Sequence, residues 1–357
     1  QVSNMTIGNP GNESYQHLPE RYLPTYFGSD KVEAVPRYDS TTGNDLKPRK
    51  GKAIRRLRIS RSGVDLYLKS PRTFWMRWCH NLPEAPSSPM MTINTGTGTL
   101  LEAEANRLRD EISQGRSGKM AILRGTPLED AVPWTHPNDP DFVNRICGRP
   151  GGWRKSENTA LPYTRSGEKK PAFDIYGELD EIFSITDEDG NEQLVIIDFK
   201  SKAKHFKIGK KGEYAGRPNT KLLDEFQEFG GWLRIQGDFY QWHLRRCLDK
   251  TGVSTPIHPI AYFVYVNLDA TESKNVTFAA AGDRVSFHFD VYTVPHQMES
   301  DWIEPTLDLM VDCLRMNTPP AAQISVTSTG KPRYHHEREY GKRYHWLWDN
   351  HPSTRDY

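Results

Sequence analysis

The sequence predicts an α/β fold in which a mixed, partly antiparallel central sheet is flanked by helices. Two β-type runs, 173–185 and 193–200, stand on either side of a turn and favour a hairpin. A long run with helical periodicity follows at 222–248, and two more β-type runs follow at 259–268 and 284–294. This succession of strands, helix and strands is typical of a mixed sheet covered by helices.

Length and composition indicate a folded protein. The 357 residues suffice for one large core with insertions or for two domains. The formal net charge is +1, so a site for a polyanion would need local clustering of cations. Four scattered cysteines without a CxxC pair favour free thiols in a reducing cytosol, and no apolar run approaches the roughly 20 residues of a membrane span. We therefore expect a cytoplasmic protein without a membrane partner.

The first part of the chain is expected to be an arm followed by helices. Residues 1–52 lack a sustained apolar period and predict an extended or poorly ordered N-terminal arm. Ser62 can cap a helix, and Ser70-Pro71 can start a second one with an aromatic face. A further helix is predicted over 98–112. These helices form a helical N-terminal elaboration of one domain that spans 53–320.

The other segments of that domain are less regular. Residues 120–170 are rich in Pro and Gly and predict an irregular insertion, one candidate for a loop that contacts substrate. Asp189-Gly190 is the expected turn of the hairpin. A last helix is predicted over 297–316, and residues 321–357 read as a basic, aromatic C-terminal tail.

The second hairpin strand ends in charged residues. Side chains two apart in a strand share a face, so Asp198 and Lys200 are expected to point one way and Phe199 the other. Pairing across the turn can bring the Asp180 carboxylate within reach of the same cation. Mg²⁺ is held by one or two carboxylates together with water and phosphate oxygens. A solvated ion pair between Asp198 and Lys200 is the alternative interpretation of this spacing.

Three short motifs in this order resemble the PD-(D/E)XK nuclease superfamily, in particular its RecB-like branch, which includes the CRISPR adaptation nucleases. The motifs are GELDEI at 177–182, VIIDFKSK at 195–202 and QGDFYQWHL at 236–244. The resemblance implies that the catalytic residues are Asp180, Asp198, Lys200, Gln236 and Tyr240. Gln236 and Tyr240 are four apart, so on a helix they lie one above the other. Their alternative interpretation is a surface amide and a core aromatic.

The resemblance also implies further metal ligands. Gly98 and Glu102 match a Gly-x-x-x-Glu pattern of the family, which makes Glu102 the third expected ligand and Glu104 its competitor. An exposed helix acid is the alternative for Glu102. The backbone carbonyl of Phe199 is an implied ligand as well. Ser70 stands where many relatives carry the first cysteine of an iron–sulfur cluster, so no cluster is expected.

A basic loop follows the candidate catalytic strand. Cations in such a loop contribute sequence-independent phosphate contacts, although most lysine-rich loops are only solvated. The expected phosphate-binding residues are Lys202, Lys204, Lys207, Lys210 and Lys211. Trp153, in a Gly-rich loop, is a candidate for stacking on unpaired bases, with a core position as the alternative.

Together these features predict an Mg²⁺- or Mn²⁺-dependent deoxyribonuclease of exonuclease type that acts on single-stranded DNA or duplex ends. Three alternatives stay open. The first is a catalytically silent nucleic-acid-binding module of the same fold, and the second is a nuclease directed at RNA, since the same site can cut any phosphodiester. The third is an α/β protein unrelated to nucleic acid. Phage or prokaryotic recombination, repair and defence are all compatible settings.

Overall fold

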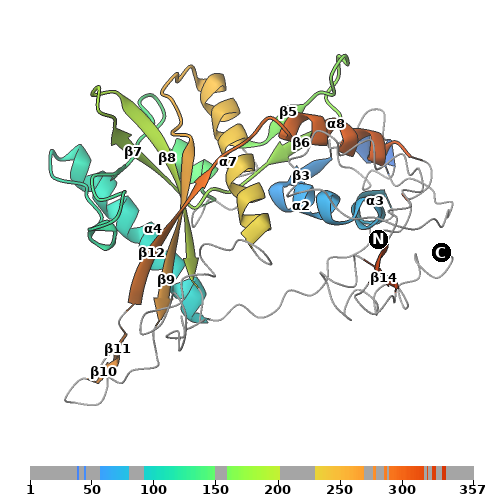
Figure 1. Cartoon of the computed structure of the whole chain (residues 1–357). Helices are drawn as coiled ribbons and strands as arrows, with labels where there is room; N and C mark the ends of the chain where they lie inside the picture. Colours follow the sequence, from blue (N-terminus) through green and yellow to red (C-terminus); the bar gives the residue numbers. More distant parts are fainter. Residues whose placement is uncertain are drawn as a thin grey trace, which may run out of the picture. The chain divides into compact units, whose positions relative to one another are not determined.

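The computed structural model describes the following residues: 38–39, 44–45, 57–79, 92–148, 159–201, 230–268, 276–278, 285–287, 289–316, 320, 324–326 and 332–334. The chain divides into two compact units (Figure 1). Unit 1 takes its residues from Gln1–Ser88, Ala160–Gly177 and Glu299–Tyr357. Unit 2 takes its residues from Pro89–Thr159 and Glu178–Met298.

In its described residues, unit 1 has three helices and a small mixed sheet. The helices are α2 (Arg61–Lys69), α3 (Pro71–Cys79) and α8 (Ile303–Leu314). In the sheet, β6 (Phe173–Tyr176) runs parallel to β3 (Arg58–Ser60) and antiparallel to β5 (Leu161–Tyr163). The predicted helix pair is confirmed, and Ser70 separates its members: the Ser70 Oγ accepts a hydrogen bond of 3.1 Å from the backbone N–H of Thr73 and caps α3.

Unit 2 holds a five-stranded mixed sheet in the order β12-β9-β8-β7-β4. Its strands are β4 (Val132–Pro133), β7 (Glu181–Thr186), β8 (Glu192–Ser201), β9 (Ile260–Leu268) and β12 (Phe289–Gln297). β8 and β9 are parallel, and the other neighbours are antiparallel. Its long helices are α4 (Thr92–Ser113) and α7 (Gly230–Thr251). The predicted class, mixed α/β with sheets flanked by helices, is therefore confirmed.

The two long helices lie on opposite faces of the five-stranded sheet (Figure 1). Under α4, buried apolar side chains from α4 and from alternate strand positions form one cluster, which includes Leu101, Ala105, Leu108, Phe183, Val195, Ile197, Val264 and Val266. Under α7, Phe263, Tyr265 and Val294 pack with Leu233 of the helix. Phe199 packs against the α4 cluster, so its side chain points away from Asp198 as predicted.

The hairpin that joins β7 to β8 is confirmed, with its turn at the predicted place. The backbone N–H of Asp187 donates to the carbonyl of Asn191 at 2.9 Å, and Gly190 has φ +83°, which suits a glycine. The Asp187 carboxylate accepts hydrogen bonds from the backbone N–H groups of Asp189 and Asn191. This acidic residue therefore stabilises the turn itself.

The structure departs from the sequence-based expectations in three places. Ser62 does not cap the first helix but lies inside α2, whose N-cap residue is Ser60. The predicted strand 173–185 is interrupted: β6 ends at Tyr176 in unit 1, and β7 begins at Glu181 in unit 2. Residues 120–148 are irregular, with only η2 (Ala121–Leu123), β4 and α5 (Phe142–Ile146). They nevertheless bury Met120, Leu123 and Leu128 against α4, so this part of the predicted insertion belongs to the core.

The remaining described elements are short antiparallel pairs: β1 (Tyr38–Asp39) with β2 (Asn44–Asp45), β10 (Val276–Phe278) with β11 (Val285–Phe287), and β13 (Ile324–Val326) with β14 (Pro332–Tyr334). Most of the predicted arm 1–52 and tail 321–357, and residues 222–229 of the predicted long helix, lie outside the described residues. In the part of the chain that is described, no helix is both long enough and apolar enough to span a bilayer.

Candidate active site

The polar end of β8 lies under α7. Asp198 is only 2% exposed. A carboxylate buried to this extent requires polar partners. Lys200 forms an ion pair with its Oδ2, and the side-chain amide of Gln236 donates a hydrogen bond of 2.9 Å to its Oδ1. Two of the motifs that are separate in the sequence thus meet at one carboxylate.

Asp180 is the second acid of this site. It directly precedes β7, and its Oδ2 accepts a hydrogen bond of 2.9 Å from the backbone N–H of Phe199. Burial, followed by the negative charge of the neighbouring Asp198, raises the pKa of Asp180 well above its usual value. Two adjacent carboxyl groups of this kind need a shared proton or a cation between them.

Gln236 and Tyr240 lie one turn apart on α7, and both side chains are buried. The Gln236 amide nitrogen donates to the Tyr240 hydroxyl as well as to Asp198, each at 2.9 Å. The interpretation of Gln236 as a surface amide is therefore wrong. Tyr240 is a core aromatic whose hydroxyl fixes the orientation of the amide.

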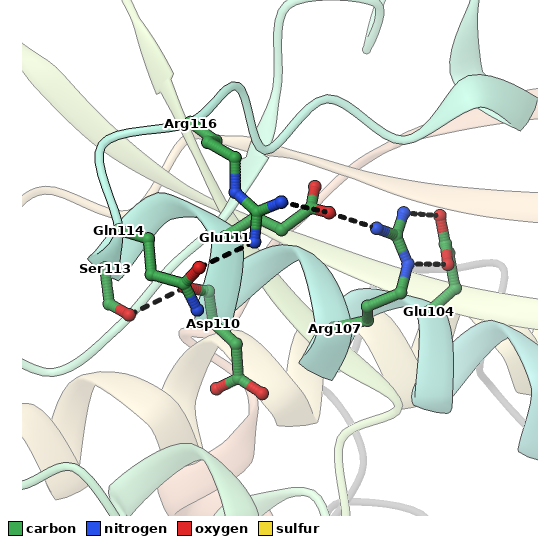
Figure 2. Close-up of polar contacts among 7 residues, drawn as sticks. All are labelled: Glu104, Arg107, Asp110, Glu111, Ser113, Gln114 and Arg116. Carbon is green, nitrogen blue, oxygen red and sulfur yellow. Dashed lines mark hydrogen bonds and ion pairs between the residues drawn. The ribbon is translucent and has the colours of Figure 1, made fainter.

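The acids of α4 have a different environment. Glu102 is partly buried on α4, and the described residues contain no group of three or more His, Cys, Asp or Glu side chains that could hold a metal ion. The role of Glu102 as a third ligand stays a prediction. Its competitor Glu104 forms hydrogen bonds of 2.7 and 2.8 Å with Arg107, in the polar chain that Figure 2 shows along the outer side of α4.

The donor set at the end of β8 suits a hard divalent cation. Two adjacent, largely buried carboxyls lie within reach of one ion, and the backbone of Phe199 is in contact with one of them. Mg²⁺ and Mn²⁺ accept such oxygen ligands and commonly leave other positions to water or phosphate oxygens. The residues therefore fit the ion that the motif implies.

Three groups next to this site were not predicted from the sequence. Glu181, which follows Asp180 in the chain, is fully buried and paired with Arg109 of α4. Tyr265 lies beside Lys200 in the parallel register of β8 and β9, and burial, followed by the charge of Asp198, raises its pKa to about 12. Asp238 of α7 pairs with His296 of β12. Only Glu181 carried a local signal, its position beside the motif aspartate.

The predicted nucleic-acid contacts cannot be placed against this geometry. Trp153, Lys202, Lys204, Lys207, Lys210 and Lys211 all lie outside the described residues and stay predictions. When the chain was compared with models of protein families, with curated proteins and with solved structures, none of the three comparisons found a match.

Proposed function

We propose that the chain is a divalent-metal-dependent nuclease that hydrolyses phosphodiester bonds in DNA. The observation that carries this proposal is the arrangement at the end of β8: the Asp180 carboxyl accepts the backbone N–H of Phe199, the residue after Asp198, and Lys200 is paired with Asp198. A buried carboxyl pair next to an ammonium is costly to maintain for stability alone. The same residues form the motifs by which the sequence resembles RecB-like nucleases.

Each residue has a role that follows from its contacts. Asp180 and Asp198 would hold Mg²⁺ or Mn²⁺, with the Phe199 carbonyl and Glu102 as the further ligands that the resemblance implies. When bound, such an ion activates water and neutralises charge on a phosphate. Lys200 places a positive charge where it can orient the attacking water or stabilise a developing negative oxygen. Gln236 orients Asp198 through its hydrogen bond.

The test is cleavage of end-labelled linear single-stranded DNA, duplex DNA and RNA, beside a closed circular DNA, with Mg²⁺, Mn²⁺ or EDTA. Native protein is compared with Lys200→Ala. Lys119→Ala is the matched control, because Lys119 is an exposed lysine of the same unit, paired with an exposed Asp130. We expect metal-dependent cutting of DNA that Lys200→Ala removes and Lys119→Ala retains.

The other outcomes identify the alternatives. Faster cutting of RNA than of DNA would assign the same site to an RNA nuclease. A folded native protein that cuts nothing with any metal, yet retards DNA in a salt-sensitive way, would replace the proposal by a silent binding module. The closed circle reports whether a free end is required, which distinguishes exonuclease from endonuclease action.

A further inference from the structure

Three consecutive residues of α7 lie over three neighbouring strands. Gln236 donates to Asp198 on β8 at 2.9 Å. A Cβ added to Gly237 would lie 3.6 Å from Phe263 Cζ on β9, directly beside Asp198 in the sheet register. Asp238 Oδ1 lies 2.7 Å from His296 Nε2 on β12. One short stretch of helix thus meets the sheet at β8, β9 and β12 in their spatial order.

The outermost of these contacts is a buried polar pair. Asp238 is 0% exposed and His296 is 5% exposed. A carboxylate buried to this extent is strongly disfavoured without hydrogen bonds, so the geometry of its contact to the imidazole is tightly constrained. Because Asp238 has no access to solvent, it cannot touch a substrate, and any effect on chemistry must act through its neighbours.

Gly237 allows the histidine to approach the helix. A Cβ at this position would lie only 2.8 Å from His296 Cδ2, which is closer than real Cβ contacts allow. The imidazole therefore packs directly on the helix backbone between Gln236 and Asp238. A side chain at 237 would displace either the ring or the helix.

We propose that Asp238 and His296 are positioning residues that fix the rotation of α7 about its own axis and thereby hold the Gln236 amide on Asp198. A rotation of about 20° moves a side-chain tip that lies about 5 Å from a helix axis by about 2 Å, which is enough to break a hydrogen bond. The Asp238–His296 pair holds α7 against β12. The hydrogen bond from Gln236 to Asp198 on β8 depends on the helix orientation that this pair fixes. Its consequence for catalysis rests on the proposed nuclease function.

The first test is a double-mutant cycle in the full chain with metal-dependent DNA cleavage as readout. We expect His296→Ala to lower kcat about tenfold at an unchanged KM for DNA, and to lower it less than about twofold when Gln236 is already Ala, because the pair acts through Gln236. His296→Gln, whose amide N–H can still reach Asp238, should restore most of the loss. Equal losses in both backgrounds would overturn the proposal.

His136→Ala is the matched control. His136 is also buried, at 3% exposure, and its Nε2 lies 2.9 Å from the Thr251 Oγ1 at the other end of α7. That contact is about 20 Å along the helix from Asp238. We expect His136→Ala to leave kcat unchanged at a temperature where it is folded. A loss of kcat equal to that of His296→Ala would show that the Asp238–His296 pair contributes only to overall stability, and this would overturn the proposal.

A second readout needs no catalysis. The side-chain amide resonance of Gln236, identified by its loss in Gln236→Ala, reports hydrogen exchange of the N–H groups that meet Asp198 and Tyr240. We expect His296→Ala to accelerate this exchange about tenfold or more, and His136→Ala to leave it unchanged. Unchanged exchange in folded His296→Ala would overturn the proposal.

This readout separates the two proposals. If the native protein cuts nothing but exchange accelerates as expected, the nuclease proposal fails and the positioning role stands. Gly237→Ala is the second disruptive variant in case His296→Ala does not fold, because it keeps both partners and displaces the ring. It is expected to accelerate the exchange in the same way, and unchanged exchange in this variant would equally overturn the proposal.

Discussion

The two faces of the five-stranded sheet are built from different materials. The face under α4 is covered by a continuous apolar cluster in which Phe183, Val195 and Val264 are fully buried. The face under α7 has a smaller apolar group, and its buried polar side chains include Asp198, Gln236, Asp238, His243 and His296. Apolar burial contributes about 25 cal/mol per Å², whereas buried polar groups at best offset their own desolvation.

This difference suggests a division of labour within one unit. The α4 face supplies the free energy that keeps the sheet folded, and the α7 face uses part of it to hold charged groups out of water. The α4 face nevertheless contains a buried polar pair, Arg109 with Glu181. Arg109 of α4 donates to Glu181, to the Trp134 carbonyl at 2.8 Å and to the Ile182 carbonyl at 3.3 Å, next to the site.

The largest expected effect is that of Asp180→Asn. An amide can still accept the N–H of Phe199, but the substitution removes one of two neighbouring carboxyls. We expect cleavage to fall at least about a thousandfold, while the free energy of unfolding without metal rises by about 1 kcal/mol. Urea unfolding in EDTA measures the free energy of unfolding, and cleavage of DNA with Mn²⁺ measures the activity. A variant that is both less stable and active would contradict the division between the faces.

The next effect is that of Arg109→Met. It removes the arginine that is paired with the fully buried Glu181 carboxylate, which keeps the hydrogen bond from the backbone N–H of Ile182, and should lower the free energy of unfolding by about 3 kcal/mol. Arg107→Met is the matched control on the same helix, where the arginine is half exposed and its loss should be barely measurable. Urea titrations compare the variants.

The double variant Arg109→Met/Glu181→Leu sharpens the comparison. It should recover most of the stability, because a buried ion pair and an apolar pair of similar volume are often nearly equivalent. We expect its cleavage rate to stay within about tenfold of native. A restored fold with cleavage lost would show that this pair of the α4 face also positions Asp180.

The third prediction concerns His243, which is buried on α7 and stacks on Phe239 with ring centroids 5.8 Å apart. Burial lowers the pKa of His243 from 6.5 to about 3. Below pH 6.5 the unfolded chain therefore takes up a proton that the folded chain excludes until about pH 3. This residue alone removes up to about 1.4 kcal/mol of stability per pH unit in that window.

Unfolding free energies at pH 7.5 and 5.5 test this dependence. His243→Leu should lose about 1 kcal/mol less than native protein over this step, since leucine has no proton to exclude. The slope should not vanish, because burial also lowers the pKa of His136. Equal slopes in native protein and His243→Leu would show that the imidazole is already solvated in the folded state.

Local patterns were enough to predict much of unit 2. The β7–β8 hairpin follows from alternating apolar residues around Asp189-Gly190, and the described part of α7 follows from its helical periodicity. The break between β6 and β7 was missed because Gly177 is the only interruption in a continuous β-type run. Which sheet each half joins depends on long-range packing, which no local pattern encodes.

The same limit applies to the candidate site. Asp198 and Lys200, or Gln236 and Tyr240, are set side by side by the repeat of a single strand or helix. Asp238 and His296 are 58 residues apart, and Arg109 and Glu181 are 72 apart. Such pairs depend on how α7 and α4 are rotated over the sheet. Residue spacing could therefore predict Lys200, Gln236 and Tyr240 beside the carboxylates. It could not predict the Asp238–His296 and Arg109–Glu181 pairs, which hold α7 and α4 against the sheet.

The smallest expected effect is that of Tyr265→Phe. This substitution tests whether a residue of β9 contributes to the candidate active site at the end of β8. Tyr265 lies beside Lys200, and its raised pKa keeps the hydroxyl neutral at any pH where the protein would be assayed, so it cannot act as a base. Removing the hydroxyl should cost about 1 kcal/mol of stability and less than tenfold in cleavage. A loss as large as that of Lys200→Ala, with stability intact, would place Tyr265 among the residues that orient the ammonium and would extend the reactive part of the face to the parallel strand.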